Sequence, residues 1–234
     1  MRGQHSAIII KLSAMFDYKK FFLDLFFPIQ CLGCNKEGAW LCQDCLAKIK
    51  INLKDRPHRP SQAPALSGVW VAADYKQSLV ANALHSFKYN FISNLGQDLS
   101  DLLISFLASK ISQKKVSGFD LVIAVPLARK RRLWRGFNQA EILAQRVSEK
   151  FGWPLGSNLI SRKYHTHPQV GLKAAARLSN VRGIFVVNNC QLLKNKKVLL
   201  VDDVMTTGAT MQECARALKE SGAREVWGLV VAKG

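Results

Sequence analysis

The sequence has few acidic residues and no long uninterrupted apolar segment. Sixteen Asp and Glu stand against 34 Lys and Arg, so the 234-residue chain carries a formal charge of +18. Its most apolar stretch, residues 7–27, is broken by five charged side chains between positions 11 and 24, which is too many to span a bilayer. The run Ile8–Ile10 is too short for the core of a secretory signal. These features favour a cytoplasmic protein.

The positive charge is concentrated in one part of the chain. Residues 126–200 contain fifteen Lys or Arg but only two acids, Glu141 and Glu149. Such a concentration favours a polyanionic partner, which would be bound through its phosphates. A solubilising surface charge is the alternative, although that charge is usually spread more evenly.

Cysteine is scarce outside one short segment. Four of the six cysteines form two Cys-x-x-Cys pairs, namely Cys31, Cys34, Cys42 and Cys45. Two such pairs supply four thiolates to one tetrahedral Zn²⁺, and a closed four-cysteine site is structural because it leaves no position for a substrate. A redox dithiol or disulfides are the alternatives. The isolated Cys190 and Cys214 suit a reducing compartment.

Composition divides the chain into unequal parts. Residues 1–17 resemble an extension from an upstream start site, because Met15 opens a more typical beginning. Residues 18–51 combine an amphipathic helix, whose aromatic face could contact the inner face of a membrane, with the zinc module. The proline-containing segment 52–68 is typical of a linker. Residues 69–234 form the larger domain.

Within the larger domain, short apolar runs alternate with amphipathic segments. The predicted strands are 69–74, 121–125, 159–162, 184–187, 198–201 and 226–231; the predicted helices are 78–89, 95–109, 138–151 and 210–220, with a short helix at 46–51 and a polar segment at 163–182. This alternation predicts an α/β fold with a mostly parallel sheet flanked by helices.

The segment VLLVDDVMTTGAT at 198–210 carries the clearest functional signal. Four apolar residues predict a buried strand, and Asp202 and Asp203 follow it as acceptors for two vicinal sugar hydroxyls. Consecutive amides and three hydroxyls then open a helix, an arrangement that binds anions. An ordinary capped core helix is the alternative.

This segment resembles the phosphoribosyl pyrophosphate motif of the type I phosphoribosyltransferases. The resemblance implies that Asp202 and Asp203 are catalytic and bind the ribose hydroxyls. It implies that the 5-phosphate lies against Met205, Thr206, Thr207, Gly208, Ala209 and Thr210. Pyrophosphate, carrying Mg²⁺, leaves the anomeric carbon through a cationic transition state in that family. No Ser-His or Cys-His nucleophile set is evident, and the reaction requires none.

The basic segment after the strand 121–125 is expected to be a loop. Its candidate contacts with single-stranded DNA are Arg129, Lys130, Arg131, Arg132, Trp134, Arg135 and Phe137, which combine phosphate-binding cations with aromatic rings that stack on bases. A solvated charge run is the alternative. By resemblance, Leu127, Ala128 and Arg129 occupy the pyrophosphate loop. Arg177 and Lys173 are candidates for a lid that closes on pyrophosphate.

The zinc module, the basic segment and the sugar-phosphate motif together resemble the ComF family. Further matching positions are Gln169, Leu172, Arg177, Asn180 and Phe185. The resemblance implies DNA uptake or use of external DNA, through single-stranded DNA and proteins of the uptake machinery. One departure is Tyr164–Pro168, where a threonine-rich run would be expected.

Two functions remain open. The protein either binds phosphoribosyl pyrophosphate and single-stranded DNA without turnover as its main task, or transfers phosphoribose to a base or amine. For the second function, the acceptor pocket would lie in residues 69–110, where Tyr75 and Lys88 are the polar candidates. A vestigial site is disfavoured because the acidic pair and the following loop are intact.

Overall fold

The computed structural model describes residues 28–52, 56–59, 64–90, 92–163 and 183–234. The expected extension at 1–17, the amphipathic helix at 18–27 and the lid candidate Arg177 lie outside these residues. No helix in the described ranges combines the length and apolarity that crossing a membrane requires.

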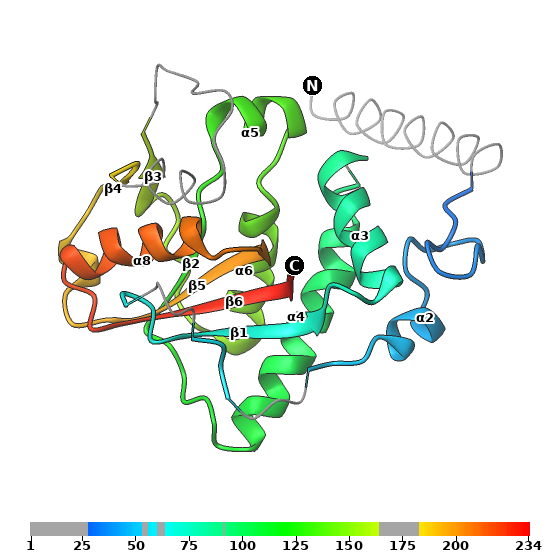
Figure 1. Cartoon of the computed structure of the whole chain (residues 1–234), viewed down its shortest axis with the longest axis horizontal. Helices are drawn as coiled ribbons and strands as arrows, with labels where there is room; N and C mark the ends of the chain where they lie inside the picture. The colour runs from blue at the N-terminus through cyan, green and yellow to red at the C-terminus, as the bar shows by residue number, and fades with distance from the viewer. Residues whose placement is uncertain (1–27, 53–55, 60–63, 91, 164–182) are drawn as a thin grey trace, which may run out of the picture.

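A four-stranded parallel sheet forms the centre of the described structure (Figure 1). Its strands are β1 (Gly68–Asp74), β2 (Leu121–Ala124), β5 (Lys197–Met205) and β6 (Glu225–Lys233), in the spatial order β1-β6-β5-β2. All three strand pairings are parallel. The residues from Val198 to Val201 are fully buried, as expected for a parallel sheet covered on both faces.

Helices cover both faces of this sheet (Figure 1). One face carries α3 (Ser78–Tyr89), α4 (Leu95–Ser112) and α6 (Gln139–Phe151), and the other carries α8 (Ala209–Glu220). Successive side chains of β5 point to opposite faces of the sheet. Leu199 and Val201 pack toward α3, α4 and α6, whereas Val198 and Leu200 pack toward α8. The predicted α/β fold is confirmed.

Smaller elements complete the described structure. They are α2 (Gln43–Lys48), α5 (Arg129–Arg135), the 3₁₀ helix η1 (Gln191–Leu193), and strands β3 (Ile160–Arg162) and β4 (Phe185–Val187). β3 and β4 form a separate antiparallel pair instead of joining the central sheet.

The segment between the cysteine module and β1 follows the edge of the sheet. Ile51 bridges Ala73, and His58 bridges Val69, both in antiparallel fashion. Leu41 and Ile49 belong to the same buried cluster as the helices on that face of the sheet. The described parts of the expected linker therefore pack against the larger domain, and the domain boundaries remain a prediction.

Three local expectations were wrong. The basic segment is not a loop: residues Arg129–Arg135 form α5, which is closed by Gly136 in the left-handed conformation at φ 77°. β5 does not end at Val201 but continues to Met205 because β6 pairs with it that far. The short helix after the cysteines spans Gln43–Lys48, since Ile49 is already extended.

Candidate sugar-phosphate site and metal centre

The acidic pair lies where β5 extends beyond its neighbour β2. The pairing of β2 with β5 ends at Ala124 opposite Val201, and Val125 donates a last hydrogen bond to the Val201 carbonyl at 2.9 Å. β6 continues beside β5 to Met205. One side of Asp202 and Asp203 is therefore left without a strand, at the carboxyl edge where parallel α/β sheets bind ligands.

Asp203 faces the helical layer that contains α3. Its Oδ1 lies 3.0 Å from Nζ of Lys88, in the last turn of α3, and also accepts a hydrogen bond from the Val204 amide at 2.6 Å. The Asp203 side chain is only 8% exposed, so the lysine supplies a nearby countercharge to a largely desolvated carboxylate. The structure thus brings Lys88, expected in an acceptor pocket, to the acidic pair.

Asp202 lies on the opposite side of β5. Its charge contributes to the raised pKa of Cys214 in α8, which places it toward that layer. Its Oδ1 accepts a hydrogen bond from the Asp203 amide at 2.9 Å. Burial, followed by the charge of Asp203, raises the pKa of Asp202 to about 8, although Lys88 and Arg135 act in the opposite direction. The two carboxylates therefore straddle the strand end.

The turn after β5 is shaped to accept an anion. Thr206 and Thr207 are exposed, and Gly208 adopts φ 81°, a conformation that favours glycine. α8 begins at the next residue, and Gly208 has no side chain to cap it. The amides of the first helical turn have no carbonyl partners within the helix, and the helix dipole adds a partial positive charge there. The predicted phosphate-binding residues thus form one continuous turn.

The basic helix α5 begins at the same edge of the sheet. Pro126, Leu127 and Ala128 lead from β2 into α5, and the Arg132 amide donates to the Ala128 carbonyl at 2.9 Å. Arg129, Lys130, Arg131 and Arg132 are exposed, whereas Arg135 is buried. Beside α5, a cavity of about 480 Å³ has Arg129, Arg132 and Arg162 among its lining side chains.

The two aromatic side chains predicted as a stacking platform are separated. Phe137 packs against Phe87 at the border of the core, with ring centroids 5.6 Å apart. Trp134 remains 56% exposed and lies beside Tyr89, at 6.0 Å. No sequence pattern indicated Tyr89, because its proximity to Trp134 depends on how α3 packs against α5.

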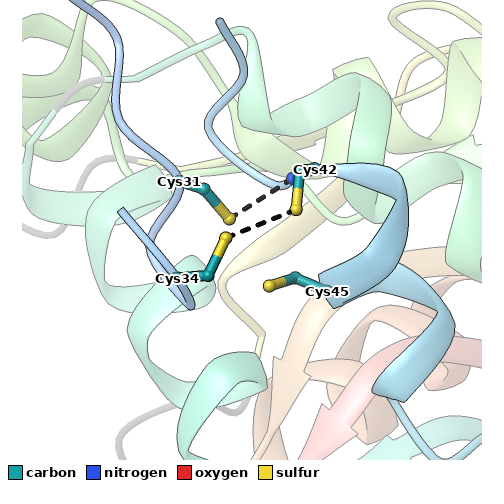
Figure 2. Close-up of side chains that lie close together, drawn as sticks. All are labelled: Cys31, Cys34, Cys42 and Cys45. Atoms are coloured by element: carbon teal, nitrogen blue, oxygen red, sulfur yellow. Dashed lines mark hydrogen bonds between the residues drawn. The ribbon is translucent and has the colours of Figure 1, made fainter. Parts of the chain in front are cut away.

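The four paired cysteines converge on one point (Figure 2). Their sulfur atoms all lie within 4.8 Å of one another, and Sγ of Cys34 is 3.6 Å from Sγ of Cys42. Sulfurs around a tetrahedral zinc are separated by about 3.8 Å, given Zn–S bonds of about 2.3 Å. The four thiols thus fit one Zn²⁺ ion as its complete set of ligands.

Local backbone structure prepares this centre. The Cys42 amide donates to Sγ of Cys31 at 3.4 Å. Burial alone raises the pKa of Cys31, but backbone hydrogen bonds from Cys42, Gly33 and Cys34 outweigh it and lower the pKa to about 6. A Cβ atom at Gly33 would lie 2.8 Å from Sγ of Cys45, so the glycine is needed for close approach between the two knuckles.

A family model covers the part of the chain that carries the acidic pair. Residues 102–233 match the family model described as "Phosphoribosyl transferase domain". The domain that carries the acidic pair is therefore a phosphoribosyl transferase domain. Among solved structures, the purine phosphoribosyltransferase of Pyrococcus horikoshii is 25% identical, with a TM-score of 0.38 over 58% of this chain and 83% of that one.

Sequence relatives extend the match to the N-terminal part. "Competence protein F" of Haemophilus influenzae is 30% identical over 209 residues, which are 85% of this chain and 89% of the relative. "DNA utilization protein YhgH" of Escherichia coli K12 is 32% identical over 160 residues, 66% of this chain and 68% of that protein. The chain belongs to the ComF family.

Proposed function

We propose that the protein binds phosphoribosyl pyrophosphate with Mg²⁺ and also binds single-stranded DNA, and that it acts in competence or the use of external DNA. The observation that carries the proposal is the junction of β5 and α8. Two carboxylates and a Thr-Thr-Gly turn stand there within seven residues, from Asp202 to Gly208. The names of the relatives, a competence protein and a DNA utilization protein, support the biological setting.

Each part of this junction suits one part of the ligand. Asp202 and Asp203 accept hydrogen bonds from the ribose hydroxyls, and the amides at the start of α8 hold the 5-phosphate. Lys88 offsets part of the negative charge at Asp203, so that the pair can face an anionic ligand. Mg²⁺ would accompany the pyrophosphate, whose charge it neutralises when bound. The loop Leu127–Arg129 is the candidate for pyrophosphate contact.

DNA binding is assigned to the exposed cations of α5. Four consecutive basic side chains are exposed from Arg129 to Arg132, and two of them, Arg129 and Arg132, line the cavity that Arg162 also lines. Arg132 is partly neutralised by Glu141, at 2.7 Å. The remaining charge favours phosphate contacts that release counterions, so the affinity should fall steeply as salt rises.

The cysteine centre is proposed to hold structural zinc. One tetrahedral ion would take all four sulfurs as ligands, which would leave no open position for chemistry. Its contribution is to fold the N-terminal module and fix it against the larger domain.

An active phosphoribosyltransferase is the second candidate, and the same acidic pair favours it. The carboxylate of Asp203, with Asp202 next to it, would stabilise the positive charge that develops when pyrophosphate leaves, without a protein nucleophile. Pyrophosphate release across a panel of bases, amines and oligonucleotides discriminates the two functions. Release with one acceptor establishes turnover, and its absence with intact ligand binding favours a binding protein.

Titration calorimetry tests the sugar-phosphate site. Wild-type protein should bind phosphoribosyl pyrophosphate in the presence of Mg²⁺, and the double variant Asp202→Ala, Asp203→Ala should not. Asp101→Asn, an exposed acid on α4, serves as the control that retains binding. If the double variant binds as well as the wild type, the assignment is wrong.

DNA binding is tested separately with labelled single strands at several salt concentrations. The variant Arg129→Ala, Arg131→Ala should bind more weakly and with a shallower salt dependence. The variant Lys194→Ala, Lys196→Ala removes the same charge near the start of β5, away from α5, and should bind like the wild type. Equal effects of the two variants would mean that α5 is not the contact surface.

A further inference from the structure

We infer that a nucleobase of a single-stranded nucleic acid stacks on Tyr89 and Trp134, at a surface formed by the ends of α3 and α5. This base site rests on the DNA-binding half of the proposed function. It specifies which side chains contact a base of the strand, in addition to the cations that contact its phosphates. Tyr89 lies outside the basic segment, at the end of α3.

The two rings form an exposed aromatic surface. Their centroids are 6.0 Å apart with 59° between the ring planes, and His85 lies 4.8 Å from Tyr89 on the same helix. Tyr89 is 47% exposed and Trp134 is 56% exposed. Aromatic side chains of this size are usually buried in cores, so two neighbouring exposed rings indicate a contact surface for an apolar or aromatic ligand.

A buried arginine supports the rings from within. The guanidinium carbon of Arg135 lies 5.4 Å from the Tyr89 ring centroid and 5.9 Å from that of Trp134. Its Nη1 donates to Oε1 of Gln139 at 3.2 Å, and Nε2 of Gln139 donates to the Phe87 carbonyl at 3.1 Å. This chain of contacts ties α3, α5 and α6 together, so the rings are held in place before a ligand arrives.

The surroundings favour a nucleic acid over other aromatic ligands. The exposed cations of α5 precede Trp134 on the same short helix, so phosphates and a base can be held together. Stacking needs a base whose face is open, which a single strand offers and an intact duplex does not.

The base site adjoins the sugar-phosphate site. Lys88, which contacts Asp203, immediately precedes Tyr89. The charge of Arg135 acts to lower the pKa of Asp202. A strand stacked on Tyr89 and Trp134 thus lies near the acidic pair.

The experiment compares a thymidine oligonucleotide with an abasic oligonucleotide of the same length, using fluorescence anisotropy at fixed salt. Both carry the same phosphates, so the difference reports base contacts. Wild-type protein should bind the thymidine strand about tenfold more tightly than the abasic one. Trp134→Ala and Tyr89→Ala should bind both strands equally, at the abasic level. Tyr89→Phe, which keeps the ring, and Leu133→Ala, which removes a 74% exposed aliphatic side chain from α5, should keep the preference.

Each other result has a defined meaning. Equal binding of both strands by wild-type protein overturns the base site while leaving DNA binding by α5 intact. If Trp134→Ala loses affinity for both strands, the ring supports α5 instead of contacting a base. If thymidine monophosphate binds as tightly as the oligonucleotide, the ligand is not a strand. Absence of binding to either strand refutes the DNA half of the proposed function and this inference with it. Circular dichroism and thermal unfolding show whether the variants remain folded.

Discussion

At the scale of single residues, three consecutive positions at the end of α3 connect the functional surfaces. The Phe87 carbonyl accepts a hydrogen bond from Gln139, Lys88 pairs with Asp203, and Tyr89 contacts Trp134. One helical turn thus reaches α6, the acidic pair and the aromatic surface. A change at any of these positions should affect a neighbouring site as well as its own.

Lys88→Met should destabilise the protein. The substitution keeps most of the aliphatic side chain but leaves the carboxylate of Asp203, 8% exposed, without its countercharge. Because Lys88 itself is 22% exposed, we expect a loss of about 1–2 kcal/mol in the free energy of unfolding, less than for a fully buried pair. Urea denaturation measures it, with exposed Lys150→Met as the control. Equal midpoints for the two variants would contradict the role given to Lys88.

Asp202 should make stability depend on pH. Its pKa rises from 3.8 to about 8 on folding, through burial and the charge of Asp203. Between these values the folded chain retains a proton that the unfolded chain has released, so this group's contribution to stability falls as pH rises. Asp202→Asn removes the titration and should gain stability relative to wild type from about pH 4 to about pH 8. Urea denaturation across that range tests this, and a constant difference would refute it.

At the scale of elements, the sites depend on where β2 ends and α6 begins. Asn138 is buried between them: its Oδ1 accepts from the Ala140 amide and its Nδ2 donates to the Val125 carbonyl, both at 3.1 Å. This single side chain caps α6 and holds the strand end from which the loop to α5 departs. The position of α5 beside the acidic pair is therefore fixed at both ends, since Gly136 closes the helix.

Asn138→Ala should lower the free energy of unfolding by about 2 kcal/mol, because it removes the cap and leaves a buried carbonyl without its donor. Asn138→Ser retains a capping oxygen and should recover about half of the loss. Thermal or urea unfolding provides the measurement. If alanine and serine behave alike, the cap is not the source of the stabilisation.

At the scale of the whole molecule, the cysteine module and the sheet share one buried cluster. Leu41 and Ile49 from the module pack with residues of α3 and α4, and Ile51 pairs with the edge strand β1. A disturbance of the metal centre is therefore expected to reach the larger domain instead of remaining in the N-terminal part.

Removal of zinc should lower the unfolding temperature of the whole chain in a single transition. Metal analysis of reduced protein should find one zinc per chain, absent in Cys34→Ser but retained in Cys190→Ser, which changes an exposed cysteine outside the cluster. Reduced wild-type protein without zinc would overturn the metal assignment. Unchanged melting of the larger domain after chelation would show that the module is energetically separate.

Local patterns predicted the elements that depend on neighbouring residues. The strand before Asp202, the helix after Gly208 and the convergence of the four cysteines all follow from periodicity and spacing within short segments. The end of β5 was misplaced because its last four residues are held by pairing with β6, a contact that the apolar run does not encode. The basic segment was predicted as a loop because its charges indicated exposure. They did not indicate that the segment forms a helix, which begins after Ala128 and ends before Gly136.

The sequence by itself determined the chemistry available: four thiols for one metal, two adjacent acids, a threonine-glycine turn and a row of cations. The members of each group lie close together in the chain, so their proximity in space required little more than local structure. Only the tertiary structure decided that Lys88 neutralises Asp203, that Tyr89 joins Trp134 over Arg135, and that Phe137 packs against Phe87 at the border of the core. Those contacts join residues far apart in sequence, and the packing of α3 against α5, α6 and the sheet fixes them.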